Sequence, residues 1–397
     1  MDENHSFSSE IEIAESTPEP LQSVHKLHDP FDWYKEMRDK APVRYDPHRD
    51  VYDVFTYKHV RKALEDGEHL IRPNLSSSES DTPLSYIDNA IVWTDGPDHN
   101  QSKGQLFPSF TPNQITDFRD NISTIVEKQI RLTVDNTSRF DFVTDFAAPV
   151  PLRVIMDFVG VPDHELDQIL DWLLKFRDQR HSEFSQFGNG RPSHMSEAVT
   201  YFKKLIAKRQ SDPGDDLISR LVTSTTLDEV AIGANCFNFI LAGQGTLTNL
   251  LSDALYTFAK HNLIGELDQY DLDVVIEEVL RYRAPLQYRS RVTTQPLTLG
   301  GTDIPEGETV ILWIGSANRD PARFTQPDSF LPERNPDHLS FGRGPHTCIG
   351  APLARLEAPI ALQTFFDTFD QINIGAPYHP TPNPSELGFE RLPVEVS

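Results

Sequence analysis

The sequence predicts a mostly α-helical fold with a small β region. Helical periodicity dominates from about residue 112 to residue 209, and it returns over residues 227–260. The second of these stretches is apolar almost all round in its middle, as expected for a helix that is buried in the core. The main predicted sheet lies in residues 289–320, which alternate in the way that is typical of strands, with glycine-containing turns between them.

Composition and charge exclude several classes of function. The 397 residues carry a formal net charge of −24, which argues against a general basic face for nucleic acid or for an anionic membrane. No run of about 18 apolar residues is present, so no helix that spans a membrane is expected. Residues 1–28 are acidic and polar, and we predict a disordered tail there rather than a signal peptide. Two cysteines cannot build a disulfide framework, which favours a cytoplasmic protein.

Short elements are predicted directly after the tail. Residues 29–42 predict an amphipathic helix, and residues 43–57 alternate around one turn, which predicts a β-hairpin. A second short helix is predicted from Tyr57 to Gly67. Residues 71–87 are rich in serine and proline and predict a long loop, of the kind that is often functional inside a compact domain.

The middle of the chain predicts helices that are separated by breaks. A short helix within residues 95–112 carries His99 and Lys103, which share one face because they are four residues apart. Prolines predict breaks at residues 149–151 and at Pro162. Further interruptions are predicted at residues 181–194 and 211–216.

The long helix over residues 227–260 is the predicted core element. Thr226 and Glu229 fit the spacing of a capping box at its start. Gly243 and Gly245 lie in its interior, where each glycine costs about 1 kcal/mol relative to alanine. They indicate either a kink or close approach to a ligand, or else helix packing on small residues. The residues alone leave both interpretations open.

A shorter helix and a final strand complete the predicted elements. Residues 270–285 predict a helix that ends at Pro285. Glu278 and Arg281 are three residues apart in this helix and can form an ion pair, whose importance depends on burial. The last residues, 387–397, predict a strand after a turn.

The stretch FGRGPHTCIGAPLARLE, residues 341–357, surrounds Cys348 with residues that stiffen or tighten the backbone. A helical run from Ala351 to Phe366 follows at once, and the positive end of its dipole favours a thiolate. These features predict a thiolate that is held in a stiff loop and directed at a ligand or metal. The loop residues concerned are Gly342, Gly344, Pro345 and Gly350.

Three other interpretations of Cys348 remain open from this stretch alone. It can be an inert cysteine, or form half of a zinc site together with His346. A structural zinc ion needs four ligands, however, and Cys236 is the single other cysteine. A Cys–His hydrolase is a third interpretation, although a spacing of two residues on a tight loop is poor geometry for it.

Four segments, in a match that runs from roughly Asp29 to the C-terminus as a single domain, resemble the cytochrome P450 haem-thiolate monooxygenases of soluble bacterial type. The stretch Phe341-Gly342-x-Gly344-x-His346-x-Cys348-x-Gly350 is similar to the loop whose cysteine is the axial iron ligand. The other three segments are Glu278-x-x-Arg281, Ala317-Asn318-Arg319-Asp320-Pro321 with Phe330 and Arg334, and Ala242-Gly243-x-x-Thr246. Their shared order and spacing identify the chain as a member of this family, so the resemblance implies the P450 fold.

The resemblance implies haem b as the cofactor, with Cys348 as the iron ligand. Thiolate ligation favours cleavage of the O–O bond. The two haem propionates need cationic or hydrogen-bonding partners, and Lys103 stands where the family usually has arginine, so it keeps the charge but loses the planar fork. The full set of cofactor-binding residues that the resemblance implies is His99, Lys103, Arg291, His346, Cys348, Phe341, Gly342, Gly350 and Ala242.

The chain departs from the family pattern at Gly245, where the family normally has an acid beside the threonine. That acid and Thr246 are thought to relay protons to dioxygen. Gln244 is an amide and cannot cycle a proton as a carboxylate does. Thr246 can still form a hydrogen bond to oxygen, with water or Thr248 completing a chain. We therefore hypothesise slow or poorly coupled oxygen activation, an unusual proton route that involves Gln244, Gly245 and Thr246, or a substrate group that helps.

The implied reaction inserts one oxygen atom from O2 into a C–H bond of an apolar or amphipathic small molecule. No reductase segment is recognisable, so electrons are expected from a separate ferredoxin-type donor and its reductase. Arg343 and Arg355 are expected to form a local basic patch for that donor. Because the usual acid is missing, a peroxide-driven peroxygenase and a haem-thiolate binding protein with low turnover are the alternatives.

Substrate contacts are expected from several separate segments, as in most ligand pockets. Arg72 is expected to be exposed, with a substrate carboxylate as the alternative partner. The expected segments are residues 71–92, 175–195, Ile240 to Gln244, Leu286–Gln287 and Leu387–Phe389.

Overall fold

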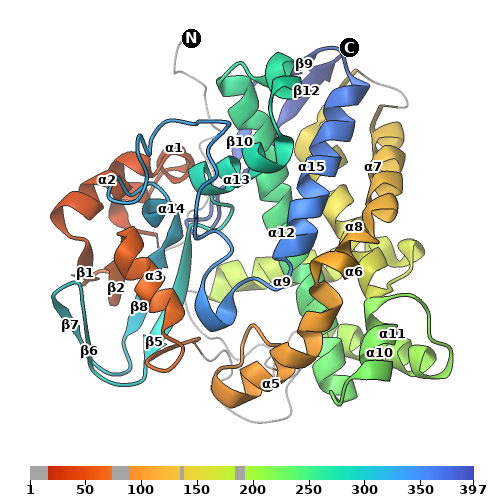
Figure 1. Ribbon diagram of the computed structural model, residues 1–397, viewed down its shortest axis with the longest axis horizontal. Coiled ribbons are helices and arrows are strands. Elements are labelled where there is room, and N and C mark those ends of the chain that lie inside the picture. Colours follow the sequence, from red (N-terminus) through yellow and green to blue (C-terminus); the bar gives the residue numbers. More distant parts are fainter. Residues whose placement is uncertain (1–16, 74–88, 135–137, 184–192) are drawn as a thin grey trace.

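The computed structural model of the chain describes residues 17–73, 89–134, 138–183 and 193–397. The fold is mostly α-helical with small sheets, which confirms the predicted class. Figure 1 shows a body of packed helices and, beside it, a smaller part in which the main sheet lies.

The helices are α1 (Val24–His28), α2 (Phe31–Lys40), α3 (Tyr57–Glu65), α5 (Gly96–Leu106), α6 (Pro112–Thr116), α7 (Arg119–Val134), α8 (Pro149–Val159), α9 (Leu166–Glu183), α10 (Ser193–Ser211), α11 (Leu217–Ser224), α12 (Glu229–Lys260), α13 (Leu272–Tyr282), α14 (Ile314–Ala317) and α15 (Ala351–Thr368). The strands are β1 (Val43–Asp46), β2 (Val51–Val54), β3 (Leu70–Ile71), β4 (Arg139–Asp141), β5 (Tyr288–Thr293), β6 (Leu297–Leu299), β7 (Thr302–Ile304), β8 (Thr309–Trp313), β9 (Ile372–Ile374), β10 (His379–Pro380), β11 (Phe389–Arg391) and β12 (Pro393–Val396).

The main sheet has the strand order β1-β2-β8-β5-β3. Strands β1 and β2 form the predicted hairpin, with Val43 opposite Val54. Strand β2 pairs in parallel with β8, and β8 pairs antiparallel with β5, so the N-terminal hairpin joins the sheet predicted far along the chain. Trp33 of α2 packs edge-on against Phe55 and Trp313, which holds α2 to this sheet.

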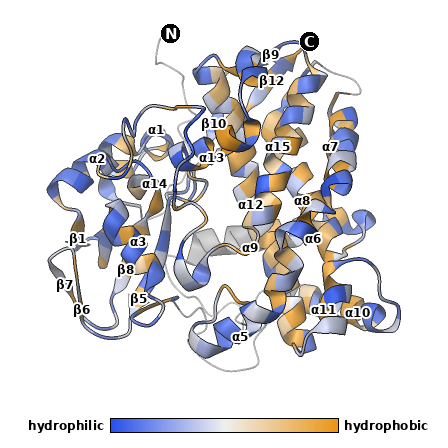
Figure 2. Cartoon of the chain, viewed as in Figure 1, coloured by the Kyte–Doolittle hydropathy of each residue, from blue (hydrophilic) through white to orange (hydrophobic). Residues whose placement is uncertain are grey.

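The helical body is organised around α12. Its hydrophobic core joins residues of α7, α8, α10, α12, α13 and α15 in one cluster. Figure 2 shows hydrophobic and hydrophilic residues alternating along helices such as α7 and α15, as expected for helices with one face on a core. Helix α12 is also long and apolar enough to cross a bilayer, but most of that stretch is buried inside the protein, as for a core helix.

The predicted disordered tail is too long. Residues 19–21 form a short 3-10 turn and α1 follows, and Leu21 and Leu27 are buried in one cluster with Trp33 and Trp313. The apolar side chains at 21, 24 and 27 recur every third residue, so they share one face of the segment that packs on the body. Residues 1–16 of the predicted tail lie outside the described residues.

The start of α12 differs from the predicted capping box. Asp228 is the cap, and its carboxylate accepts a hydrogen bond from the amide of Ala231. The Thr226 amide and hydroxyl both donate instead to the side chain of Gln105. The box fails because Asp228, one residue before the helix, offers a nearer carboxylate to the free amides.

The two glycines of α12 have different surroundings, and the helix runs through both without a break. A Cβ on Gly243 would lie 3.3 Å from the Ile155 side chain of α8, so this glycine serves helix packing. A Cβ on Gly245 would meet nothing within 4 Å. Of the two interpretations that the sequence left open, helix packing on a small residue therefore applies to Gly243, and close approach of a ligand stays open for Gly245.

Most predicted breaks are confirmed. Helix α8 begins at Pro149 and ends at Gly160, which is left-handed, and Pro162 follows. The interruption at residues 211–216 separates α10 from α11, although α11 itself and strand β4 were not predicted. The loops predicted at 71–87 and 181–194 lie largely outside the described residues.

Candidate functional site

The loop before α15 holds Cys348 in a tight and well-bonded backbone. The Cys348 amide donates to the Phe341 carbonyl at 2.8 Å, and Gly342 donates to Leu339 at the same distance. Gly344 has a positive φ of 71°, and a Cβ there would lie 2.6 Å from the Leu64 carbonyl of α3. The predicted need for glycine in this loop is therefore confirmed at Gly344, because backbone of another element takes the space.

The Cys348 side chain is reachable by solvent, although protein atoms crowd its other sides. This crowding desolvates the sulfur and raises the pKa of the thiol, against the opposing effect of the Gly350 and Ala351 amides at the start of α15. The sequence predicted the helix end to favour the thiolate. The amides act in that direction, but desolvation outweighs them, so a bound cation is what would complete deprotonation.

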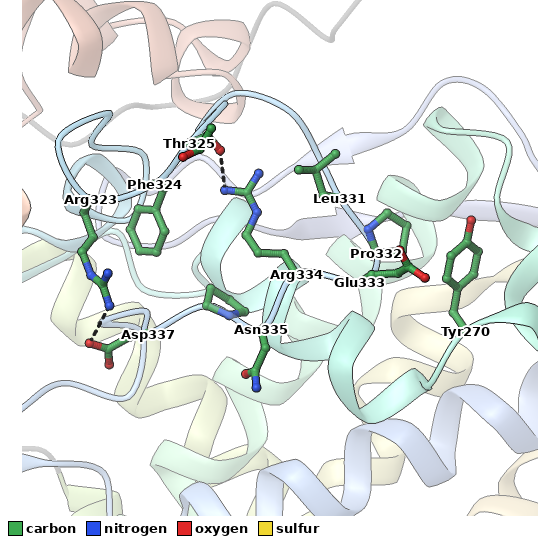
Figure 3. A pocket seen from close by; sticks show the side chains of 11 residues that line it. Tyr270, Arg323, Phe324, Thr325, Leu331, Pro332, Glu333, Arg334, Asn335 and Asp337 are labelled. Atoms are coloured by element: carbon green, nitrogen blue, oxygen red, sulfur yellow. Dashed lines mark hydrogen bonds and ion pairs between the residues drawn. The ribbon is translucent and has the colours of Figure 1, made fainter.

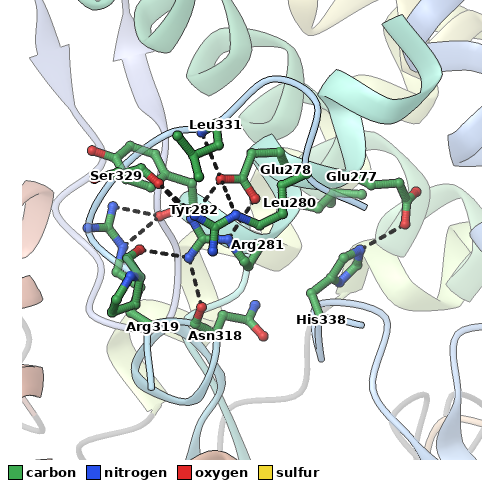
Figure 4. Close-up of polar contacts among 12 residues, drawn as sticks. Glu277, Glu278, Leu280, Arg281, Tyr282, Asn318, Arg319, Ser329, Leu331 and His338 are labelled. Atoms are coloured by element: carbon green, nitrogen blue, oxygen red, sulfur yellow. Dashed lines mark hydrogen bonds and ion pairs between the residues drawn. The ribbon is translucent and has the colours of Figure 1, made fainter. Parts of the chain in front are cut away.

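Glu278 and Arg281 form a fully buried ion pair. The guanidinium Nε and Nη2 donate to the two carboxylate oxygens at 2.7 and 2.8 Å. Arg281 also donates to three backbone carbonyls between residues 318 and 329, and the Leu331 amide donates to Glu278. Figure 4 shows these bonds converging on the pair. The sequence left open whether this pair is buried, and the structure shows that both side chains are fully buried.

Arg334 closes the same network from the outside. Its Nε lies 3.2 Å from Glu278 Oε1 without the alignment of a hydrogen bond, and its other nitrogens donate to the carbonyls of Thr325 and Gln326. It also lines a surface hollow of about 590 Å³ over residues 323–337, shown in Figure 3. That hollow lies on the meander and is not the place where the predicted catalytic residues meet.

Asn318 and Ser340 connect the ion pair to the cysteine loop. The Asn318 carbonyl accepts from Arg281, while its side chain accepts from the Leu339 amide and donates to the Ser340 hydroxyl. Ser340 in turn donates to the Leu280 carbonyl at 2.6 Å. The residues immediately before Phe341 are thus fixed by the buried pair.

Glu277 ties the loop to α15 from the other side. Arg355 binds both of its carboxylate oxygens and His338 contacts one of them. Burial opposes ionisation, but these two partners outweigh it and lower the pKa of Glu277 to about 2. Arg355 also lies over the Phe341 ring at 4.5 Å. The sequence gave no signal for Glu277 beyond its position beside Glu278.

The predicted basic patch is largely neutralised within the chain. Arg355 is paired with Glu277, and Arg343 is paired with Asp337. Asp337 also receives Arg323 at 3.1 Å and lies 3.7 Å from Arg61. The predicted local basic patch at Arg343 and Arg355 is therefore weakened but not removed, because Glu277 pairs with Arg355 while Asp337 is shared among three arginines.

The predicted propionate ligands are brought together near the cysteine loop. His99 is buried and contacts the Pro345 carbonyl through Nε2 at 3.1 Å, and Lys103 donates to the same carbonyl. The His99 and His346 rings lie 4.3 Å apart. His346 contacts Asp95 at 2.7 Å, a residue that the sequence reasoning missed although it directly precedes α5.

Arg291 supplies a direct test of whether these residues fit an anionic cofactor. It is only 2% exposed, and within the described residues its guanidinium donates to the Ser290 carbonyl and forms no ion pair with a carboxylate. Desolvation, with Arg289 adding to it, lowers the pKa of Arg291 to about 10. A buried arginine without an ion pair is costly, so the position fits an arriving propionate. Burial also lowers the pKa of Lys103.

Helix α12 is accessible over one short stretch in its middle. Residues 232–240 and 247–255 are buried, but residues 241–246 between them are exposed or partly exposed. The Thr246 hydroxyl donates to the Ala242 carbonyl at 2.8 Å, and Gln244 donates to the Thr248 hydroxyl at 3.2 Å. An accessible stretch inside a core helix marks a space for a bound group, and Gly245 borders it.

Solvent accessibility separates the predicted substrate contacts that can reach a ligand from those that are buried in the protein. Leu286 is partly accessible, as are residues 241–244, so they can face a ligand. Ile240, Gln287 and the turn Leu387–Phe389 are buried against other protein atoms, so the expectation of direct contact is wrong for them. Residues 74–88 and the side chains of 176–196 lie outside the described residues.

Arg72 is held by the chain rather than exposed. Its Nε donates to the Val92 carbonyl, its amide donates to Asp95, and its guanidinium lies 4.9 Å from the Trp93 ring.

A zinc site at Cys348 finds no support, because no group of three or more metal-binding side chains occurs in the described part of the chain. The single thiolate is what a haem iron requires from the protein on that side.

Comparison with known proteins agrees with this arrangement. Residues 271–395 match the family model described as cytochrome P450. The chain is 32% identical to cytochrome P450 109 of Bacillus spizizenii, covering 95% of both chains, and 32% identical to cytochrome P450 119 of Sulfolobus acidocaldarius, covering 92% of this chain and 99% of that one. The solved structure of CYP109E1 from Bacillus megaterium with testosterone has a TM-score of 0.83 at 30% identity, covering 94% of this chain and 99% of that one.

Proposed function

The chain belongs to the cytochrome P450 family of haem-thiolate monooxygenases, and from this premise we propose how it works and on what. It is an oxidoreductase that holds haem b. We propose that it inserts one oxygen atom from O2 into a C–H bond of an apolar or amphipathic small molecule. The observation that carries this proposal is a reachable Cys348 on a loop fixed by a buried ion pair, together with the accessible stretch 241–246 of α12.

The proposed roles of the side chains follow from their contacts. Cys348 is the iron ligand, and Phe341, Gly342 and Gly350 shape the loop around it. Thiolate-ligated haem supplies the activation of O2 and the oxidising power when it is bound. Ala242 lets the cofactor approach α12, because its side chain is small and exposed in mid-helix.

The propionates are proposed to replace contacts that the chain now makes with itself. Arg291 gains its missing anion, and His99, His346 and Lys103 lie near enough to each other to share a second carboxylate. Lys103 contributes a point charge on a flexible stem, so its position tolerates more movement than an arginine fork would.

Proton delivery is proposed to run through Thr246 and water at Gly245. The open space beside Gly245 admits a water molecule where a carboxylate would otherwise stand. The Gln244 amide is engaged with Thr248, so it orients that hydroxyl rather than moving a proton. Water without a carboxylate is a slower proton source, which predicts low coupling of reductant to product.

The substrate class is proposed from the accessible side chains. Residues 241–244 and Leu286 offer an apolar surface with one amide. Solved structures of similar proteins hold testosterone in CYP109E1 and hexadec-9Z-enoic acid on an acyl carrier protein in P450BioI. Ligands this different are consistent with an apolar or amphipathic molecule here and do not select one, because substrate choice resides in the site and not in the fold.

Electrons are proposed to come from a separate ferredoxin-type protein and its reductase. The arginines next to the cysteine loop are paired, yet Asp337 is shared among Arg61, Arg323 and Arg343, which leaves local positive charge on an acidic protein. We also propose a cytoplasmic location and a single domain from the N-terminal segment to residue 397.

The alternative is a peroxide-driven peroxygenase or a haem-thiolate protein with low turnover. The specific observation that favours it is Gly245, because the chain lacks the carboxylate that would help dioxygen to react productively. In both alternatives the roles of Cys348 and Arg291 stay the same.

The test compares the reduced protein with CO and then its products. Absorption near 450 nm is expected for the wild type and for Cys236→Ser, and its loss is expected for Cys348→Ser. Product that forms with ferredoxin, reductase and O2 supports the monooxygenase. Product with hydrogen peroxide alone supports the peroxygenase. If neither oxidant system yields product, the monooxygenase and the peroxygenase are both overturned, and the haem-thiolate protein with low turnover is left. Gly245→Asp is expected to raise the coupling of reductant to product, and unchanged coupling would count against the proposed proton route.

A further inference from the structure

A buried polar cluster adjoins the candidate pocket, by which we mean the space beside the accessible residues 241–246 of α12 and Leu286. None of the side chains in this cluster was given a role above. Arg283, just after α13, donates to the Asp253 carboxylate of α12 at 2.6 Å. The same guanidinium reaches Nδ1 of His28 at 3.3 Å. His28 belongs to α1, in the segment that the sequence assigned to a disordered tail. All three side chains are buried, at 0 to 6% exposed.

Aromatic rings enclose the other side of His28. Its ring lies edge-on to Tyr256 of α12 at 5.2 Å and to Phe389 of β11 at 5.0 Å. Tyr378 completes the enclosure at 6.1 Å. Within this enclosure, the His28 Nε2 atom is buried and has no hydrogen-bond partner among the residues that the structure describes.

The geometry requires a neutral His28. Arginine only donates, so the Nδ1 atom that faces Arg283 must accept and cannot carry a proton. The proton of the neutral ring therefore sits on Nε2. A second proton would break the contact with Arg283 and place two positive charges side by side in an apolar enclosure.

Arg283 also leads directly into the wall of the candidate pocket. Two residues later, the Pro285 carbonyl accepts from the Leu387 amide at 3.1 Å. The partly accessible Leu286 comes next and bridges to Glu386. The segment 284–287 and the turn 385–389 are therefore bonded to each other.

The turn 385–389 touches both α1 and the core helix. Phe389 packs on His28, as described above. The neighbouring Gly388 lacks a Cβ where the Asn249 side chain of α12 lies, since a Cβ would come within 2.3 Å of its oxygen. Asn249 stands three residues beyond Thr246, so one connected set of contacts joins α1 to the helix that borders the pocket.

We propose that α1 is a proton-released latch, in which neutral His28 positions the turn 385–389 and the segment 284–287 that is bonded to it, and protonated His28 lets α1 detach from them. His28 is buried among protein side chains, so it is a positioning residue. The inference rests on the proposed function only where Leu286 of this segment is taken as part of the candidate pocket.

The direction of the pH dependence follows from the groups around His28. Burial lowers the pKa of His28 well below its usual value, and Arg283, Lys260 and His25 add to this. The docked state then binds fewer protons than the released state, so docking weakens as pH falls below about 6.5. Burial raises the pKa of Asp253 to about 6 despite Arg283. In the proposal Asp253 stays paired with Arg283 inside the body when α1 detaches, so its own titration does not enter the docking equilibrium.

Substitution of His28 alone isolates its contribution, because Asp253 is unchanged in every protein compared. His28→Phe keeps an aromatic ring in the enclosure and cannot be charged. His28→Arg places a permanent charge there. His25→Gln is the matched control, since His25 is exposed on the same short helix.

The experiment is hydrogen–deuterium exchange of the holoenzyme at pH 7.5 and pH 5.5, corrected for the intrinsic exchange rates. In the wild type and in His25→Gln, residues 24–28 are expected to lose roughly tenfold in protection at the lower pH, the limit for one proton over one pH unit. Residues 284–287 and 385–389 are expected to lose protection with them. His28→Phe should stay protected at both pH values, and His28→Arg should be unprotected at both.

Two results would overturn the latch. The first is equal protection of the wild type at both pH values, or the same tenfold loss in His28→Phe. The second is loss of protection that stays confined to residues 24–28, which would remove the positioning role. Exchange needs neither reductant nor substrate, so failure of the latch is distinguishable from failure of the proposed oxygenase activity.

Discussion

The cysteine side and the α12 side of the candidate site are built in opposite ways. On the cysteine side, Glu278 and Arg281 are fully buried. They form a bidentate ion pair, and Arg281 also donates hydrogen bonds to backbone carbonyls around it. On the α12 side, residues 241–246 are accessible and Gly245 borders open space. One side is closed by polar contacts and the other is left open.

The difference follows from what each side must do. In the proposed function Cys348 binds the haem iron through one short metal–sulfur bond, so its loop would have to be held at one position before the cofactor arrives. The stretch 241–246 would instead admit O2, water and a substrate of variable shape. A closed network there would fill the space that the reaction needs.

The largest expected effect comes from breaking the closed side. Arg281→Ala leaves Glu278 buried without its partner, and we expect a loss of about 3–5 kcal/mol in the free energy of unfolding. Haem content after expression should fall with it. Denaturant unfolding and the haem-to-protein ratio measure both effects.

The matched control for this prediction is Arg61→Ala, which removes an exposed arginine paired four residues along α3. Its expected effect is within about 0.5 kcal/mol. An Arg281→Ala protein with full haem content and wild-type stability would contradict the role given to the buried pair.

A smaller effect is expected at Glu357, the exception on the closed side. This carboxyl group of α15 is buried, and its Oε1 atom has no hydrogen-bond partner in the described part of the chain. Burial raises the pKa of Glu357 well above its usual value, so the folded protein keeps the proton. Its contribution to stability is complete below the unfolded pKa of about 4.3 and is lost as pH rises through the folded pKa.

We therefore expect Glu357→Gln to be more stable than the wild type at pH 8, by about 1–3 kcal/mol, and nearly equal to it at pH 4.5. Thermal unfolding across this pH range measures the difference. Asp367→Asn is the control, because Asp367 is exposed on the same helix. A pH-independent difference between wild type and Glu357→Gln would show that the group is not protonated in the folded protein.

The smallest expected effects compare two glycines on the open side. Gly245→Ala places a methyl group in empty space and gains helix propensity, so a stabilisation of about 1 kcal/mol is expected. Gly243→Ala meets Ile155 at 3.3 Å and should gain less, or lose stability. Paired unfolding curves measure both, and equal gains would mean that α8 adapts freely to the added methyl.

Much of the fold and of the site could be predicted from the sequence because local signals there are strong. Glycine spacing, the helical run after Cys348 and the Glu278-x-x-Arg281 spacing all act over a few residues. The failures have a common cause in long-range contacts. The segment 17–28 was taken as a tail because its own sequence is polar, and Leu21 and Leu27 gain their burial from a cluster that later parts of the chain supply, including Trp33 and Trp313.

The same distinction applies within the site. The sequence indicated Arg343 and Arg355 as a basic patch, but Arg343 is paired with the nearby Asp337, and Arg355 is paired with Glu277 of α13, far away in the chain. It also placed the turn Leu387–Phe389 against substrate, whereas Phe389 is buried on His28. Pairing between distant segments cannot be deduced from residue types alone.

The sequence by itself determined the mostly helical class, the glycine-rich loop around Cys348 and the absence of an acid at Gly245, since each depends on residue identity at short spacing. The tertiary structure alone decided that Glu278 and Arg281 are buried, that Arg291 is buried without an ion pair among the described residues, and that Gly243 packs where Gly245 is open. It also decided that His28 meets Arg283. These features depend on which distant atoms share a space, and burial and charge compensation exist only once the chain has folded.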